Sequence, residues 1–167
     1  MNTLNEPLRA ATLIIGYGNP SRGDDALGPT AIDAITVLAN GHPEWGEVDV
    51  VTDFQLQIEF VTDLAARARI VFIDASSRGA APFSFAPLAA KQDASITTHA
   101  VSPASLLTVF RRFYGLEAAP SFLLGIKGYE FELGEALSGG ARQNLDAALA
   151  MLEQWLTVEC AGAARHA

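Results

Sequence analysis

Short apolar runs alternate along the chain with longer segments in which apolar residues recur at helical spacing. The apolar runs predict strands at residues 12–15, 48–52, 70–73, 83–85 and 122–126. Helical spacing predicts helices over residues 26–39, 56–68, 102–114 and 138–158. The first run, which ends at Gly16, lacks the polar alternation of a half-exposed strand. We therefore expect this strand to be buried on both faces.

Residues that start or limit regular structure support this division. Pro29 falls in the first turn of its helix, where a missing N–H costs nothing. Ser102 and Pro103 form an N-cap followed by proline at the first helical position. Pro82 and Pro87 flank the fourth strand, which indicates a place at the edge of the sheet.

The order of the elements, β-α-β-α-β-β-α-β-α, predicts the fold class. It indicates one α/β domain over residues 1–167, with a largely parallel sheet covered by helices on both faces. We expect flexible tails at residues 1–10 and 161–167. In such sheets ligands bind outside the carboxyl ends of the strands, so chemistry is expected at that edge.

Composition and charge exclude several classes of function. Half of the residues are hydrophobic and 18% are charged, which is typical of a globular protein. The 19 acidic residues outnumber the 11 basic ones and no basic stripe occurs, so nucleic acid is not an expected partner. No apolar run is long enough for a membrane span, and no secretory signal pattern is visible, so we expect a cytoplasmic protein. The one cysteine, Cys160, is expected to be buried rather than nucleophilic.

The loop after the first strand combines glycines with two adjacent carboxylates. Residues 16–28 read GYGNPSRGDDALG. A dinucleotide-binding loop would need a third glycine where Ser21 stands, and Asp24 and Asp25 would repel a pyrophosphate at the helix start. A phosphate cradle is therefore a poor interpretation. An N-cap role explains one aspartate, most simply Asp24, and leaves Asp25 as the functional candidate.

Two more polar residues belong to the same edge of the predicted sheet. Asp74 ends the third strand, and His99 lies shortly before the third helix. Each has an ordinary explanation, because aspartates often form turns at strand ends and loop histidines are usually structural or solvated. We expect the other two histidines, His42 and His166, to be solvated and idle. The topology brings Asp74 and His99 towards Asp25, and this convergence is what suggests a site.

Asp25, Asp74 and His99 together offer two carboxylates and one imidazole. This donor set suits zinc, manganese, iron or nickel. The chain has no H-E-x-x-H helix, no G-x-S-x-G elbow and no plausible Cys–His pair. Zincin, serine-peptidase and cysteine-peptidase chemistry therefore lack support.

The segment GYGNPSRGDDALG resembles the opening motif of the hydrogenase maturation proteases. These enzymes remove a C-terminal extension from the large subunit of nickel–iron hydrogenases after nickel insertion. Further similarity lies, in the same order, at residues 72–75, 98–107 and 125–130, so the resemblance spans most of the chain. It implies a five-stranded α/β/α sandwich and a monomeric, aspartyl-type endopeptidase whose partner is the large-subunit precursor.

The resemblance also assigns roles to residues. Asp25 and Asp74 correspond to the two metal-binding carboxylates of the family, and His99 corresponds to the imidazole. The implied metal is nickel supplied by the substrate, and zinc or cadmium can occupy the same position. Three such ligands would hold nickel weakly, which suits an enzyme that inspects nickel already bound by its substrate.

One segment departs from the family pattern. Many members carry an Asp-Gly-Gly-Thr-like segment after the second strand, where this chain has TDFQLQ at residues 52–57. This variant resembles the branch associated with soluble bidirectional hydrogenases. Asp53 is a candidate to replace the missing aspartate with a shift of one position.

The sequence leaves the route to peptide-bond cleavage open. Nickel could polarise the scissile carbonyl or activate a water. It could instead only position the substrate while Asp24 or Asp53 acts as general base, so Asp24, Asp25 and Asp53 are the candidate catalytic residues. Two other functions stay open: a nickel chaperone with the same ligands, and a nucleotide-binding protein that uses Gly16 and Gly18.

Overall fold

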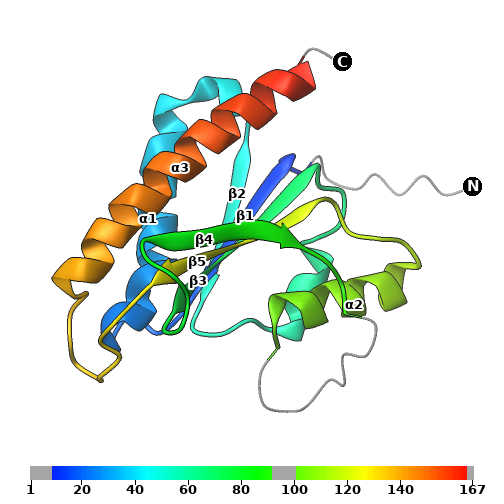
Figure 1. The fold of residues 1–167 in the computed structure, drawn as a ribbon. Coiled ribbons are helices and arrows are strands. Elements are labelled where there is room, and N and C mark those ends of the chain that lie inside the picture. The colour runs from blue at the N-terminus through cyan, green and yellow to red at the C-terminus, as the bar shows by residue number, and fades with distance from the viewer. Residues whose placement is uncertain (1–8, 92–100, 165–167) are drawn as a thin grey trace, which may run out of the picture.

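A five-stranded sheet forms the middle layer of the molecule (Figure 1). The computed structural model describes residues 9–91 and 101–164. The strands are β1 (Thr12–Tyr17), β2 (Val48–Asp53), β3 (Arg69–Ser76), β4 (Phe83–Leu88) and β5 (Ser121–Lys127). Their spatial order is β2-β1-β3-β5-β4; β2, β1, β3 and β5 pair in parallel, and β4 runs antiparallel to β5.

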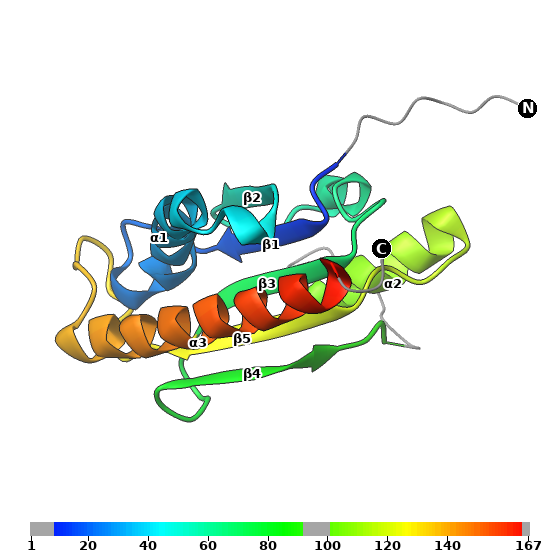
Figure 2. The ribbon, with the colours of Figure 1, turned by 90° about the horizontal axis from the view of Figure 1, so that it is seen from above.

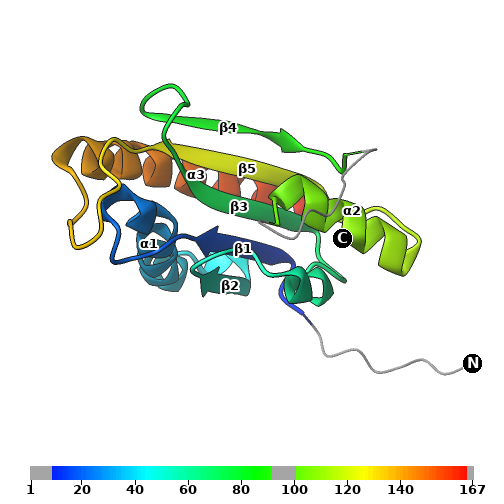
Figure 3. The same cartoon turned by 90° about the horizontal axis from the view of Figure 1, so that it is seen from below.

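Helices cover both faces of the sheet (Figures 2 and 3). They are α1 (Leu27–Gly41), α2 (Pro103–Tyr114) and α3 (Gly139–Ala164). α1 and α3 lie on one face, while α2 and a short 3₁₀ helix, Ile58–Thr62, lie on the other. The predicted three-layer α/β/α sandwich is therefore confirmed. Within the described residues, no helix is both long and apolar enough to cross a bilayer.

The interior strand β1 is buried on both faces, as its sequence predicts. Ile14 packs in the core beneath α1 and α3, whereas Leu13 and Ile15 pack in the core beneath α2. All three side chains are fully buried. The strand thus divides the core into two halves, and the loop that leaves its carboxyl end starts from a rigid position.

The starts of two helices agree with the prediction. Oγ of Ser102 accepts a hydrogen bond from the N–H of Ser105 at 3.1 Å and so caps α2. Oγ of Ser138 accepts one from Ala141 at 3.2 Å at the start of α3. α3 continues well beyond its predicted end, so the flexible tail expected from Ala161 is wrong for its first residues.

Burial of Cys160 explains the additional turns of α3. The predicted burial of this thiol is confirmed, since the residue belongs to the core shared by α1 and α3. Its Sγ donates a hydrogen bond to the carbonyl oxygen of Trp45 at 3.6 Å. The last turns therefore pack against the core instead of fraying.

The helix expected over residues 56–68 does not form. The 3₁₀ helix Ile58–Thr62 and a series of turns take its place. The apolar pattern is still satisfied, because its main side chains are buried in the core beneath α2: Leu56, Val61 and Leu64. Ala66 adopts a φ of 59°, which a continuing right-handed helix cannot contain.

All five strands are longer than the sequence predicts, and β3 and β4 gain the most residues. β3 continues to Ser76, so Asp74 lies inside the strand, opposite Gly125 of β5, and does not end it. β4 includes Pro87 instead of stopping before it. A proline is tolerated there because β4 is an edge strand, whose outer N–H groups have no neighbouring strand to bond. The predicted edge position is confirmed.

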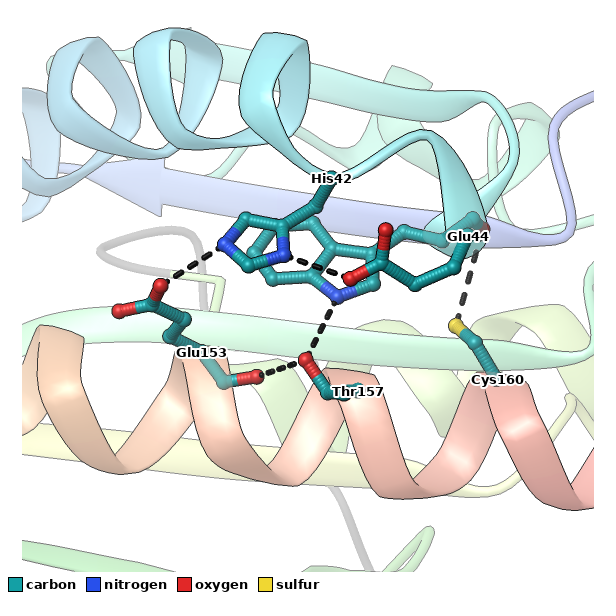
Figure 4. A network of polar contacts seen from close by, with 6 residues as sticks. His42, Glu44, Glu153, Thr157 and Cys160 are labelled. Carbon is teal, nitrogen blue, oxygen red and sulfur yellow. Dashed lines mark hydrogen bonds and ion pairs between the residues drawn. The ribbon is translucent and has the colours of Figure 1, made fainter.

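The expectation that His42 is solvated and idle is wrong (Figure 4). Its ring stacks on Trp45, with centroids 4.2 Å apart and planes 4° apart. Nδ1 lies 2.7 Å from Oε1 of Glu44, and Nε2 lies 2.8 Å from Oε1 of Glu153 on α3. Hydrogen bonds to Glu44 and Glu153 raise the pKa of His42 above its ordinary value. The protonated ring donates from both nitrogens and ties the end of α1 to α3.

We expect the bonds from His42 to Glu44 and Glu153 to stabilise the protein less as the pH rises. A raised folded-state pKa gives stabilisation that is complete below the unfolded value of about 6.5 and lost as pH rises through the folded value. His42→Ala should therefore lower the Tm by a few degrees at pH 6 and by less at pH 9 in thermal unfolding. An equal fall in Tm at both pH values would show that the charge of His42 does not contribute to stability.

Candidate functional site

A cavity of about 380 Å³ opens at the carboxyl edge of β1. Four parts of the chain form its wall: the start of the β1–α1 loop, the segment that follows β2, Asp74 of β3, and Val101 just before α2. Its polar lining consists of six side chains: Tyr17, Asn19, Arg22, Asp25, Gln55 and Asp74. The cavity thus lies where the topology predicts ligand binding.

Glycines allow the β1–α1 loop to fold tightly against its surroundings. Gly18 has a φ of 145°, and a Cβ there would overlap the carbonyl oxygen of Asp25. Gly23 has a φ of 54°, and a Cβ there would overlap the carbonyl oxygen of Glu130. The first contact closes the loop onto itself, and the second presses it against the β5–α3 loop. The glycines of the motif therefore serve close backbone packing rather than phosphate binding.

The carboxylate of Asp24 joins the same two loops. The residue is fully buried. Oδ2 accepts hydrogen bonds from the N–H groups of Tyr129 and Glu130 at 2.7 and 3.0 Å. Oδ1 accepts one from the N–H of Ser138 at 2.7 Å, and the Ser138 hydroxyl donates to Oδ2 at 2.8 Å. One side chain thus satisfies the backbone of a loop more than a hundred residues away in sequence.

These contacts correct the interpretation of Asp24 as an N-cap. A 3₁₀ helix, Gly23–Ala26, precedes α1, so Asp24 lies inside a helical turn and no side chain caps α1. Burial alone would raise the pKa of Asp24, but its hydrogen bonds from Tyr129, Glu130 and Ser138 outweigh burial and lower that pKa. The carboxylate therefore stays ionised and structural.

We expect Asp24→Asn to destabilise the protein, because an amide NH₂ would face backbone donors. A buried donor left without an acceptor costs about 1–3 kcal/mol, so the free energy of unfolding should fall by at least that amount. A lowered folded pKa gives stability that is present above the unfolded value and lost as pH falls. Urea unfolding should show the deficit at pH 7 and a smaller one below about pH 4.

Ser138→Ala is the comparison: it removes the hydroxyl that donates to Asp24 and caps α3, but leaves the three backbone donors to Asp24 in place. An Asp24→Asn protein as stable as the wild type at pH 7 would contradict the role of this carboxylate.

Asp25, in contrast, lines the cavity. Its Oδ2 accepts one hydrogen bond, from the N–H of Asn19 at 2.8 Å, which fixes the carboxylate against the loop. The side chain is half-buried. Adjacent residues in a tight turn point in different directions, so Asp24 faces the interior while Asp25 faces the cavity. The sequence prediction that the two aspartates differ in role agrees with this geometry.

Asp74 meets Asp25 in the same cavity. Burial raises the pKa of Asp74 to about 6, although a hydrogen bond with Tyr17 and one with the backbone of Ala75 oppose the shift. The charge of Asp25 raises it further. The two carboxylates are therefore close enough to repel each other, an arrangement that a shared cation would relieve.

We expect Asp74→Asn to stabilise the protein at pH 8. Because the folded pKa of about 6 exceeds the ordinary 3.8, the charged carboxylate costs stability as pH rises through 6. Allowing for partial exposure, the gain should be on the order of 1 kcal/mol at pH 8 and should shrink towards pH 4. Urea unfolding at both pH values measures it. A loss of stability at pH 8 would show that burial and repulsion of the Asp74 charge do not outweigh its hydrogen bonds.

Asp53 lies beside the cavity and not in its lining. It is the last residue of β2, and its Oδ1 accepts a hydrogen bond from the N–H of Phe54 at 2.6 Å. Asp53 lines a neighbouring cavity, also about 380 Å³, which shares Gly18 and Phe54 with the first. The two cavities thus meet at the exposed ring of Phe54.

His99 lies outside the described residues, as does His166. Val101, two positions after His99, lines the cavity. Within residues 9–91 and 101–164, no three metal-binding side chains gather closely enough to hold an ion. A metal held by Asp25 and Asp74 would therefore need a further ligand from outside these described residues.

Sequence reasoning missed four polar residues of the cavity: Tyr17, Asn19, Arg22 and Gln55. Three of them belong to the loop motif, but the motif drew attention to its carboxylates alone. The strand register could have indicated Tyr17. Gly16 of β1 pairs with Ile73 of β3, so the next residues of these two parallel strands, Tyr17 and Asp74, lie side by side. Burial raises the pKa of Tyr17, and the charge of Asp74 and a hydrogen bond to it raise that pKa further, so the hydroxyl stays protonated.

Known structures share the fold of this chain, although no sequence comparison identifies a relative. No family model matches the sequence, and no curated protein matches it significantly. The [NiFe] hydrogenase maturation protease HycI from Thermococcus kodakarensis KOD1 superposes with a TM-score of 0.68 at 22% identity, covering 90% of this chain and 94% of that one. The hydrogenase maturating endopeptidase HybD from E. coli gives 0.63 at 21% identity, with 84% and 88% covered.

A third solved structure is the hydrogenase 2 maturation peptidase from a Thaumarchaeota archaeon. It gives a TM-score of 0.61 at 22% identity, with 87% of this chain and 97% of that one covered. These likenesses extend over nearly the whole of each chain. This chain therefore has the fold of the hydrogenase maturation proteases, as its loop motif predicts.

Proposed function

We propose that this protein is an endopeptidase that removes the C-terminal extension of a [NiFe]-hydrogenase large-subunit precursor. One observation carries the proposal: Asp25 and Asp74 line a single cavity at the carboxyl edge of the sheet. The sheet belongs to a fold shared with hydrogenase maturation proteases. Burial and mutual repulsion make this pair of carboxylates costly, which supports a functional role.

His99 is the proposed third ligand. Its position in sequence supports this, because two residues span at most about 7 Å of extended chain and Val101 lines the cavity. Two carboxylates and one imidazole suit nickel, with zinc or cadmium as substitutes. The donor set of this chain therefore fits the metal of the proposed substrate.

Nickel in this proposal belongs to the substrate. Three protein ligands without a thiolate make a weak site, so the enzyme would engage nickel that the precursor already holds. Affinity for the precursor would then depend on metal insertion. A precursor without nickel would bind poorly and escape cleavage.

Asp53 is the proposed general base. Asp24 is poorly suited, because its carboxylate is fully buried and accepts four hydrogen bonds. Asp53 is partly exposed and faces a cavity that adjoins the one containing Asp25 and Asp74. It would take a proton from the attacking water while the metal ligands hold the substrate in place.

The proposal predicts a change in mass of the precursor. After incubation with purified protein, nickel-loaded precursor should lose the mass of its C-terminal extension, whereas nickel-free precursor should stay intact. Mass spectrometry distinguishes the two. A nickel-loaded precursor that is bound but not shortened would favour a nickel chaperone, and equal processing without nickel would refute recognition of the metal.

His99→Ala tests the third ligand. We expect a loss of cleavage of more than about 100-fold with an unchanged far-UV circular dichroism spectrum, because a ligand and not a core residue is removed. His42→Ala is the matched control, since His42 precedes the start of β2, does not line the cavity and is bound by Glu44 and Glu153. Full activity of His99→Ala would remove this histidine from the site.

A further inference from the structure

Arg22 places a cation in the cavity with Asp25 and Asp74 but pairs with neither of them. All three residues line the cavity. The ion pairs of the described residues involve other side chains, and none includes Arg22. Opposite charges that share a cavity of about 380 Å³ without pairing remain available to an outside group.

Arg22 is exposed, and one hydrogen bond orients its guanidinium. Its Nε donates to the carbonyl oxygen of Phe131 at 2.8 Å, in the loop held by Asp24. The backbone of Arg22 is fixed as well, since its N–H donates to the carbonyl oxygen of Asn19 and its own carbonyl oxygen accepts from Asp25. Among the described residues, its two terminal nitrogens have no partner. Held by Nε, an arginine presents these donors in a fixed fork.

We propose that Arg22 binds the substrate polypeptide through a backbone carbonyl oxygen, which accepts hydrogen bonds from both terminal nitrogens. This inference rests on the proposed function. A carbonyl oxygen is the acceptor that every peptide segment offers, and an arginine fork binds oxygen acceptors in a defined direction. The carboxylates of Asp25 and Asp74, which pair with no cation among the described residues, would remain free for the metal.

This role differs from simple anchoring of the β5–α3 loop. Anchoring needs only the hydrogen bond from Nε to Phe131. Arg22→Ala and Arg22→Lys both lack Nε, but only the lysine keeps a positive charge and N–H donors in the cavity, and the Tm of each variant reports whether the loop stays anchored. The two variants therefore separate substrate binding from loop anchoring.

The test measures the Kd of nickel-loaded large-subunit precursor by biolayer interferometry. Arg22→Ala should weaken binding by roughly 10- to 100-fold, the range expected for a lost hydrogen bond to a charged group. Arg22→Lys should weaken it clearly less, because the point charge remains. Arg112→Ala removes an exposed arginine from α2, away from the cavity, and should change the Kd less than about 2-fold.

In cleavage assays the loss in Arg22→Ala should appear in KM and leave kcat nearly unchanged. Equal weakening by the alanine and lysine variants, with equal falls in Tm, would reduce Arg22 to a loop anchor and overturn the inference. Wild-type binding by Arg22→Ala would overturn it as well. If the wild-type protein binds the precursor through Arg22 but leaves it uncut, the endopeptidase proposal fails while the binding role of Arg22 stands.

Discussion

The buried carboxylate of Asp24 holds the β1–α1 loop against the β5–α3 loop across the carboxyl edge of the sheet. Its four hydrogen bonds satisfy three backbone N–H groups and the hydroxyl that caps α3. Two glycines without side chains, Gly23 and Gly128, let the loops approach this closely. Because the loops are fixed, Asp25 and Arg22 have defined positions at the cavity.

The same loop therefore contains one aspartate that stabilises the fold and another that does not. Asp24 gains hydrogen bonds that lower its pKa, whereas Asp25 repels Asp74 and helps to raise the pKa of that residue. A cavity that keeps two carboxylates close together in part-buried surroundings loses stability for as long as it lacks a cation. Sites with this property are frequently functional.

The sequence predicted the layers and most elements because the spacing of apolar residues along the chain determines which side chains can be buried together. The apolar run at β1 and the Ser102 cap are examples of such local signals. It failed over residues 56–68, where the same buried side chains suit a helix or a series of turns. It also missed the bonds that join Asp24 to Ser138 and His42 to Glu153, because these partners lie more than a hundred residues away. Pairing over such separations depends on tertiary structure, which a local pattern does not encode.

The central claim is that Asp25, Asp74 and His99 share one divalent ion. An anomalous difference map from a crystal grown with cadmium tests it most directly, because cadmium is electron-rich and suits the same ligands. The account predicts a peak in the cavity within bonding distance of both carboxylates and an imidazole nitrogen of His99. A peak at His42, Glu44 and Glu153 instead, with the cavity empty, would contradict it.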